Sequence, residues 1–367
     1  MPRPPGTRAA VQLFLATRVL LWTVAVIVLA GFPELLNPNR GTWDSGRMHD
    51  LGRFVDVWAR WDSDWYIKIA QGWYDWPSGR PAFFPLYPSV IAALAKALGS
   101  HAVLSGVVAS LIAGTIAAAL LHRLVARKLG EDVALRAVLY LAIFPTSLFL
   151  GAVYSESLFL ALAIGTFVAA ERGRLGWASV LAGLALLTRS QGVALLPALA
   201  WFVWRSPRPR RNGWLLGVPP VMFSAYPLVL WVCIGHPFAF LEAQQVTWQR
   251  SFDLFAPITA PFHGLVGGEA VEAVFAFSMI ALAAAAYRLV GVPYGLYATV
   301  ALWLPLAYPS TKGWLYSFPR LSLAAFPCLI ALAVLTARPR AQLVVSTVLA
   351  AGLVTFVVRW ALWEWVA

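Results

Sequence analysis

The sequence predicts an all-α integral membrane protein that crosses the bilayer many times. Hydrophobic residues make up 60% of the 367 residues and charged residues only 12%, whereas a typical soluble domain has roughly 25% charged residues. Long runs of Ala, Leu and Val without strict alternation suit helices, which pair every backbone amide within the segment, better than barrel strands. Basic residues gather in short loops between these runs, which is typical of cytoplasmic loops.

About eleven runs are apolar enough to be spans, since a span needs about 20 residues. They lie near residues 9–31, 102–121, 133–151, 156–171, 175–188, 191–204, 214–234, 271–289, 293–308, 321–336 and 341–363. The first run follows basic residues as in a signal peptide, but its length indicates an uncleaved span. We therefore expect a cytoplasmic N-terminus.

With this orientation, successive loops alternate between the two sides of the membrane. The basic loops, at residues 122–128, 171–174, 205–211 and 338–340, then all lie on the cytoplasmic side. We expect one membrane domain over residues 1–367 with two long outer segments, 32–100 and 235–270. Outer segments of this length without a role are uncommon. The first holds an apolar-aromatic stretch, residues 83–98, and we expect it to form short interfacial helices.

Several function classes are disfavoured by the same residues. The net charge of +12 resides in the short loops and not in a basic stripe with interleaved aromatics, so we expect no nucleic-acid partner. Both cysteines, Cys233 and Cys328, lie inside apolar runs, which argues against a disulfide framework. The five histidines show no metal-ligand spacing.

Two carboxylates, Asp62 and Asp64, lie in the Trp-rich segment of residues 60–66. Carboxylates at a membrane surface cost desolvation unless something compensates them. Such a group can take the proton of an attacking hydroxyl or bind a divalent cation. Two residues apart, the acids diverge on a helix and converge on an extended segment, and both alternatives stay open. An ion pair in a solvated loop is the simpler interpretation.

Three further polar groups precede helices predicted to run inward: Tyr154-Ser155-Glu156-Ser157, Thr188-Arg189-Ser190-Gln191-Gly192, and residues 312–320. Helix N-termini favour bound anions such as phosphate. Together with Arg189, Lys312 and Arg320, they predict a phosphate site at the outer surface. The simpler alternatives are helix capping by Ser155 and arginine side chains that reach the interface.

As an ordered set these residues resemble the PIG-V/Gpi18-like mannosyltransferases, which are GT-C membrane glycosyltransferases. Gln191 stands where the family usually has Asn, and Asp64 stands where no fixed acid is expected. The resemblance runs through Trp61-Asp62, Ile69-Ala70, Gly72, Tyr74, Phe83-Phe84-Pro85-Leu86-Tyr87-Pro88, Tyr154-Ser155-Glu156-Ser157-Leu158-Phe159, Thr188-Arg189-Ser190-Gln191-Gly192 and Pro319-Arg320.

The resemblance implies a GT-C-like helical bundle and a polyprenyl-phosphate mannose donor. It also implies inverting transfer to a hydroxyl on the extracytoplasmic face. Asp62 is then the general base, or a ligand if a divalent cation is required. Arg189, Arg320 and Lys312 would bind the donor phosphate. We expect the remaining pocket residues to meet them in one site: Arg60, Trp61, Asp64, Tyr154, Glu156, Ser190 and Gln191.

Other functions stay open at this point. The main alternative is a transporter or lipid flippase, although the polar groups collect near one predicted surface and no internal repeat is evident. A scaffold, or transfer of another sugar or of phosphoethanolamine, is also compatible. The acceptor is open among a glycolipid, a lipoglycan and a membrane-linked protein. The Arg-rich composition is typical of prokaryotes, so we expect a bacterial plasma membrane.

Overall fold

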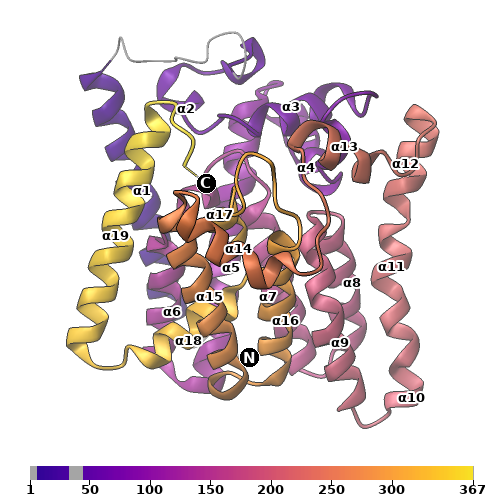
Figure 1. Cartoon of the computed structure of the whole chain (residues 1–367), viewed down its shortest axis with the longest axis vertical. Helices are drawn as coiled ribbons and strands as arrows, with labels where there is room; N and C mark the ends of the chain where they lie inside the picture. The colour runs from indigo at the N-terminus through magenta and orange to yellow at the C-terminus, as the bar shows by residue number, and fades with distance from the viewer. Residues whose placement is uncertain (1–5, 33–43, 367) are drawn as a thin grey trace. The chain divides into compact units, whose positions relative to one another are not determined.

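The computed structural model describes residues 6–32 and 44–366, which form helices joined by turns. Over these residues the all-helical prediction is confirmed (Figure 1). Five helical stretches in this part of the chain are long and apolar enough to cross a membrane: Thr7–Gly31, Ala102–Leu129, Pro209–Ile234, Ala270–Leu289 and Pro339–Ala361. The other predicted spans correspond to shorter or interrupted helices, so the number of eleven crossings stays a prediction.

The chain divides into two compact units, each described here by itself. Unit 1 comprises residues 1–73, 85–161 and 336–366. Its helices α1 (Thr7–Gly31), α5 (Ala102–Leu129), α6 (Glu131–Ile143) and α19 (Pro339–Ala361) pack side by side. Gly114 permits close packing of α5 on α1, since a Cβ there would lie 2.6 Å from the Phe14 ring.

A buried arginine on α1 supports the loop that leads to the Tyr154 motif. Arg18 is 4% exposed and donates hydrogen bonds to the carbonyls of Ala142 (2.6 Å) and Ser147. Ser147 begins the 3-10 helix η4 (Ser147–Leu150). A charged group within a membrane helix is costly unless backbone or side-chain partners satisfy it. Arg18 therefore joins α1 to the loop that contains η4, and backbone carbonyls satisfy its charge.

The first long segment folds into short helices. Its described residues form η2 (Gly46–Met48), α2 (Arg53–Asp56), α3 (Ser63–Gly72), η3 (Arg80–Ala82) and α4 (Leu86–Ala97). Residues 33–43 of the predicted loop lie outside the described part of the chain. The longest of these helices, α4, has 12 residues, which at 1.5 Å per residue is too short to cross a bilayer of about 30 Å.

Unit 2 comprises residues 74–84 and 162–335. Most of α7 (Glu156–Glu171) belongs to it, and it continues through the following helices. Around Phe167 it has an aromatic core, with Tyr294, Tyr297 and Phe326 rings at 4.6, 5.5 and 5.4 Å. The remaining elements are α8 (Leu175–Leu186), η5 (Ser190–Ala194), α9 (Leu195–Trp204), α10 (Pro209–Asn212), η6 (Gly213–Gly217), α11 (Val218–Phe223), α12 (Ala225–Ile234), α13 (Ala239–Trp248), α14 (Ala256–Val266), α15 (Ala270–Leu289), α16 (Val292–Leu306), α17 (Phe318–Ser322) and α18 (Phe326–Leu335).

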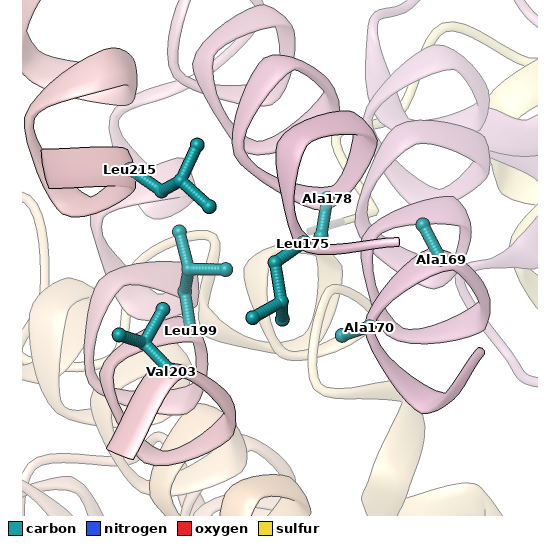
Figure 2. Packing of buried hydrophobic residues seen from close by; sticks show 7 residues of the cluster. All are labelled: Ala169, Ala170, Leu175, Ala178, Leu199, Val203 and Leu215. Atoms are coloured by element: carbon teal, nitrogen blue, oxygen red, sulfur yellow. The ribbon is translucent and has the colours of Figure 1, made fainter. Parts of the chain in front are cut away.

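A second apolar cluster joins the facing ends of α7, α8, α9 and η6 (Figure 2). Leu175 at the start of α8 lies among side chains of the other three elements, including Leu199 and Leu215. Ala169, Ala170 and Ala178 keep the neighbouring helix faces small. Contacts among these apolar side chains therefore stabilise the packing of the short helices against one another.

Two residues hold the second long segment in place. Arg250 donates to the carbonyls of Tyr308 (3.0 Å) and Tyr316 (2.9 Å). Glu269 accepts a hydrogen bond from the Trp314 backbone amide at 3.0 Å. Both contacts join the 235–270 segment to the 308–316 loop, which immediately precedes the predicted phosphate-binding Arg320.

Candidate functional site

In unit 1 the Trp-Asp segment forms a tight turn that Tyr154 holds. The Asp62 amide donates to the Tyr154 hydroxyl at 3.2 Å, and the same hydroxyl donates to the Arg60 carbonyl at 3.1 Å. Between them Trp61 has φ +55°, a left-handed conformation that costs a bulky side chain roughly 1–2 kcal/mol. The Tyr154 side chain is fully buried, so one hydroxyl satisfies both ends of the strained turn.

A network of hydroxyl groups extends from this turn to α4 and α5. The Tyr66 hydroxyl lies 2.8 Å from the Ser155 hydroxyl, and Tyr87 lies 2.8 Å from Ser110. Ser110 in turn donates to the Tyr154 carbonyl at 3.1 Å. Buried polar groups are retained when every member has a partner, and such networks fix one arrangement of the side chains. The network therefore holds two segments of the predicted motif set, far apart in sequence, in one geometry.

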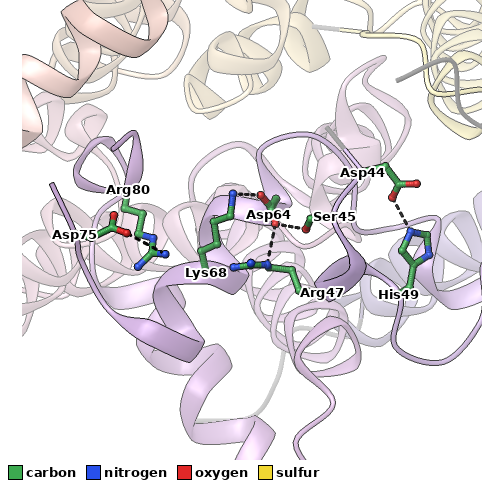
Figure 3. Close-up of polar contacts among 8 residues, drawn as sticks. All are labelled: Asp44, Ser45, Arg47, His49, Asp64, Lys68, Asp75 and Arg80. Carbon is green, nitrogen blue, oxygen red and sulfur yellow. Dashed lines mark hydrogen bonds and ion pairs between the residues drawn. The ribbon is translucent and has the colours of Figure 1, made fainter. Parts of the chain in front are cut away.

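The two neighbouring acids have different environments. Asp62 is 7% exposed and precedes α3, and Asp64 lies in its first turn, so the helical alternative holds. Asp64 pairs with Lys68, accepts a hydrogen bond from Ser45 at 2.5 Å and lies 3.5 Å from Arg47 (Figure 3). Two cations and one hydroxyl group therefore already contact the Asp64 carboxylate. Glu156, at the start of α7, is also buried, at 4% exposure.

Other carboxylates of the first segment have structural partners. Asp44 lies 2.6 Å from His49, and Asp75 lies 3.1 Å from Arg80 (Figure 3). Asp50 contacts His101 at 2.5 Å, and Asp56 accepts hydrogen bonds from the backbone amides of Asp50 and Leu51. These four acids are therefore interpreted as structural groups of the segment and are assigned no chemical role.

The aromatic segment of residues 360–365 packs on the Trp-Asp turn. The Arg60 guanidinium lies 4.2 Å above the Trp363 ring, and Trp61 meets Trp363 and Trp365 edge-on at 6.0 and 5.5 Å. Trp360 donates to the Val57 carbonyl at 2.7 Å. Arg60 is 4% exposed, and its Nε and Nη1 have no hydrogen-bond partner among the described residues. Burial lowers its pKa to about 9, partly opposed by Asp44, so it is a cation at neutral pH.

Within unit 2, Gln191 connects the two predicted phosphate-binding segments. Its carbonyl oxygen accepts a hydrogen bond from Arg189 Nε at 3.3 Å. Its amide donates to the Leu321 carbonyl at 2.9 Å and to the Ala301 carbonyl at 3.3 Å. Gln191 is 3% exposed. Because Leu321 follows Arg320 on α17, this one side chain places η5 and α17 together against α16.

The remaining predicted site residues are more accessible. Ser190 begins η5 and is exposed, and Lys312 is exposed on the loop before α17 with its ammonium 5.8 Å from the Tyr316 ring. The predicted helix N-termini are present at Glu156, but 188–192 and 312–320 lead into the short elements η5 and α17. The anion site expected there must therefore rest on the arginine side chains and not on a long helix dipole.

Among the residues that the structure describes, no group of three His, Cys, Asp or Glu side chains is placed to hold a metal ion. Asp62 as a ligand of a divalent cation therefore stays a prediction. Six or more oxygen ligands are usual for Ca²⁺ and Mg²⁺, many of them water or substrate oxygens.

Three features that support the loops and the turn of the candidate site were not predicted from the sequence: Arg18, Arg250 and the segment of residues 360–365. A basic residue inside the first apolar run was a usable signal for Arg18, because such a residue needs a partner. The three tryptophans at 360, 363 and 365 had no detectable signal beyond their aromatic density. Each unit thus brings part of the predicted site together, and one common pocket stays a prediction.

Comparison with known proteins places these features in a family. Residues 9–203 match the family described as mannosyltransferase (PIG-V). A curated relative, the mouse GPI alpha-1,6-mannosyltransferase 2, is 36% identical over 149 residues, which cover 38% of this chain and 30% of the mouse protein. The chain therefore spans less than a third of that relative in the alignment.

Solved structures agree at the level of the fold. ArnT from Cupriavidus metallidurans in the apo state superposes with a TM-score of 0.55 at 17% identity, covering 93% of this chain and 63% of ArnT. The same enzyme bound to undecaprenyl phosphate gives 0.51 at 18% identity, covering 91% and 63%. Since the family match covers more than half of the chain and includes the Trp-Asp turn, Tyr154 and Arg189, the chain belongs to the PIG-V mannosyltransferase family.

Proposed function

We propose that this protein transfers mannose from polyprenyl-phosphate mannose to a hydroxyl of a lipid-linked, glycan or protein acceptor, with inversion at the anomeric carbon. The acceptor oxygen forms a bond to the anomeric carbon while the bond from that carbon to the phosphate oxygen breaks. The hydroxyl proton passes to the Asp62 carboxylate, and polyprenyl phosphate leaves with both electrons of the broken bond.

The observation that carries the proposal is the contrast between Asp62 and Asp64. Asp62 is buried in a turn held by Tyr154, whereas Asp64 is neutralised by Lys68 and Arg47. A general base must be positioned and able to accept a proton. We therefore assign Asp62 to the chemistry and no chemical role to Asp64.

The leaving phosphate is assigned to unit 2. Arg189 and Arg320 lie on segments that Gln191 holds together, and guanidinium groups bind phosphate through paired hydrogen bonds. Lys312 would support the same role from its exposed loop. Ser190 directly follows Arg189 in the sequence and is included in the same proposed site. ArnT, which shares the fold, has been solved with undecaprenyl phosphate, and this likeness supports a polyprenyl-linked donor here.

In unit 1 we assign contact with the substrate to Arg60, Trp61, Tyr154 and Glu156. Two guanidinium nitrogens of Arg60, Nε and Nη1, have no protein hydrogen-bond partner among the described residues, which suits contact with an anionic or hydroxyl-rich substrate. We further propose that the reaction takes place on the extracytoplasmic face of a bacterial plasma membrane, with the N-terminus in the cytoplasm. The support for this orientation is the distribution of basic loops.

The direct test is to incubate membranes containing the protein with radiolabelled polyprenyl-phosphate mannose and to identify the labelled product by mass. Transfer of one hexose from the lipid donor supports the proposal, and its mass identifies the acceptor. Use of a sugar nucleotide alone would contradict the proposed donor. A parallel incubation with EDTA measures whether a divalent cation is required.

We expect Tyr154→Phe to lower kcat about 10–100-fold, because loss of the hydroxyl loosens the turn that positions Asp62. The donor KM should change much less. The variant should also be less stable by about 1–3 kcal/mol, since a buried amide and a buried carbonyl each lose a partner. Thermal unfolding in detergent and steady-state kinetics measure both effects. Tyr66→Phe, which removes the hydroxyl contact with Ser155, serves as the matched control with a smaller kinetic loss.

We expect Trp363→Ala to lower kcat/KM about fivefold or more, because a cation–π contact of about 1 kcal/mol or more that holds Arg60 is lost. Trp363→Phe keeps a ring under the guanidinium and should retain most activity. Leu343→Ala, on the exposed face of α19, the helix that precedes Trp363 in the chain, should behave as wild type. Equal activity of Trp363→Ala and wild type would show that the aromatic segment only covers the turn.

A further inference from the structure

At the end of unit 2 that carries the arginine-rich loops, a groove opens between α8 and η6–α11. Its volume is about 600 Å³, and its lining comes from residues 173–177 and 180 on one side and 212, 214, 215 and 218 on the other. This lies within the range of about 300–1,000 Å³ found for small-molecule sites. Arg189 follows the opposite end of α8, so the groove is separate from the proposed donor-phosphate residues.

The floor of the groove is apolar and well packed. Leu175 and Leu215 are each 7% exposed and belong to the cluster that joins α7, α8, α9 and η6 (Figure 2). Val180 and Val218 extend the apolar lining along the two helices. A hydrocarbon chain can lie along such a surface, whereas a small hydrophilic anion gains nothing from it.

The rim is aromatic and basic. Trp177 and Trp214 are 66% and 70% exposed, and indole rings of this kind favour the lipid headgroup layer. Arg174 and Asn212 supply N–H groups in the lining; the Asn212 amide also donates to Ser206 at 3.0 Å. The adjoining loops add further cations at Arg172, Arg205, Arg208, Arg210 and Arg211, and the nearby carboxylate Glu171 accepts a hydrogen bond from Tyr294.

We propose that this groove is a binding site for an anionic glycerophospholipid. Its phosphate would contact Arg174 and Asn212 between the two tryptophans, and an acyl chain would lie along Leu175, Val180, Leu215 and Val218. The occupant follows from charge complementarity, because basic pockets between membrane helices bind anionic headgroups. The apolar floor distinguishes a lipid from a free phosphate.

Two glycines allow a test that leaves the charges unchanged. Gly176 lines the groove, and no atom of the described part of the chain lies within 4 Å of a Cβ built there. A leucine at this position is expected to fill part of the groove, and it also favours the helix that begins there. Gly217 is equally open at the same end of the unit but does not line the groove. Gly217→Leu is the matched control for Gly176→Leu.

The full chain is purified in mild detergent with equal amounts of phosphatidylglycerol and phosphatidylcholine that have the same acyl chains, and the retained lipid is measured by native mass spectrometry. We expect wild type and Gly217→Leu to retain phosphatidylglycerol at least about fivefold over phosphatidylcholine. Gly176→Leu should lose this retained lipid. Arg174→Gln should lose the preference, whereas Arg288→Gln, at an exposed arginine of α15 that belongs neither to the lining nor to the rim, should keep it.

Three results would overturn the inference. Equal retention of the two lipids by wild type would remove the anionic preference. Unchanged phosphatidylglycerol in Gly176→Leu would place the lipid elsewhere. Displacement of the lipid by inorganic phosphate alone, at millimolar concentration, would show that the groove recognises a free anion and not a phospholipid. Size-exclusion profiles that match wild type establish that each variant is folded.

Discussion

Asp62→Asn is expected to lower the rate of mannosyl transfer about 10²–10⁴-fold, the usual contribution of a positioned general base. The amide has nearly the shape of the carboxylate, so the turn held by Tyr154 should persist. The loss should appear in kcat, measured with radiolabelled polyprenyl-phosphate mannose and equal amounts of folded protein in the membrane. Donor KM should stay close to the wild-type value.

Asp64→Asn is the matched control, because the two acids are two residues apart and differ in environment. Its ion pairs with Arg47 and Lys68 are partly exposed, and such pairs contribute about 0–1 kcal/mol. We expect this variant to retain activity within about fivefold of wild type, which is the same energy expressed as a rate. Full activity in Asp62→Asn, or inactivity confined to Asp64→Asn, would contradict the assignment of the base.

Arg189→Ala is expected to raise the donor KM about 10–100-fold, since a hydrogen bond to a charged group contributes about 1.5–3 kcal/mol. Arg189→Lys should be intermediate, because lysine keeps the charge but lacks the planar pair of donors. The measurement is initial rate against donor concentration at saturating acceptor. Arg288→Ala, an exposed arginine at the end of α15 in the same unit, is the control. An effect on acceptor KM alone would contradict a role at the donor phosphate.

Together the two variants separate the two parts of the proposed reaction. A loss of kcat at Asp62 and a raised donor KM at Arg189 would assign proton transfer to unit 1 and phosphate binding to unit 2. The same kinetic change in both variants would instead indicate that they disturb one shared structural feature. The Gln191 contacts with Arg189 and Leu321 make Gln191→Ala informative here, since it should reproduce part of the Arg189 phenotype.

Local sequence patterns predicted the helices well where apolar runs were long. The spans expected near residues 9–31 and 102–121 correspond to α1 and α5, because an uninterrupted apolar run in a bilayer has few alternatives to a helix. Boundaries were less predictable where helices are short. The span expected near residues 321–336 is divided between α17 and α18, with a break at residues 323–325 that only Pro327, in the first turn of α18, marks in the sequence.

The candidate site was likewise predictable from the sequence only in part. Arg60, Asp62, Tyr154 and Gln191 were all found from motifs, and the turn that joins the first three is consistent with that selection. The roles of the tryptophans at 360, 363 and 365 could not be predicted, because their contacts with the turn join residues some 300 positions apart; the bond from Trp360 to Val57 spans 303 residues. A residue's neighbours at such separations depend on the packing of α19 against α1, which no local pattern encodes.

The sequence alone determined that this is a helical membrane protein and which short polar segments carry its family character. Those properties depend on composition and on residues adjacent along the chain. Only the tertiary structure decided that Asp64 is paired with cations, whereas Asp62 is buried in a turn to which Tyr154 hydrogen-bonds. The physical reason is that Ser45, Arg47 and Tyr154, which make the difference, lie up to 92 residues from the acids they contact.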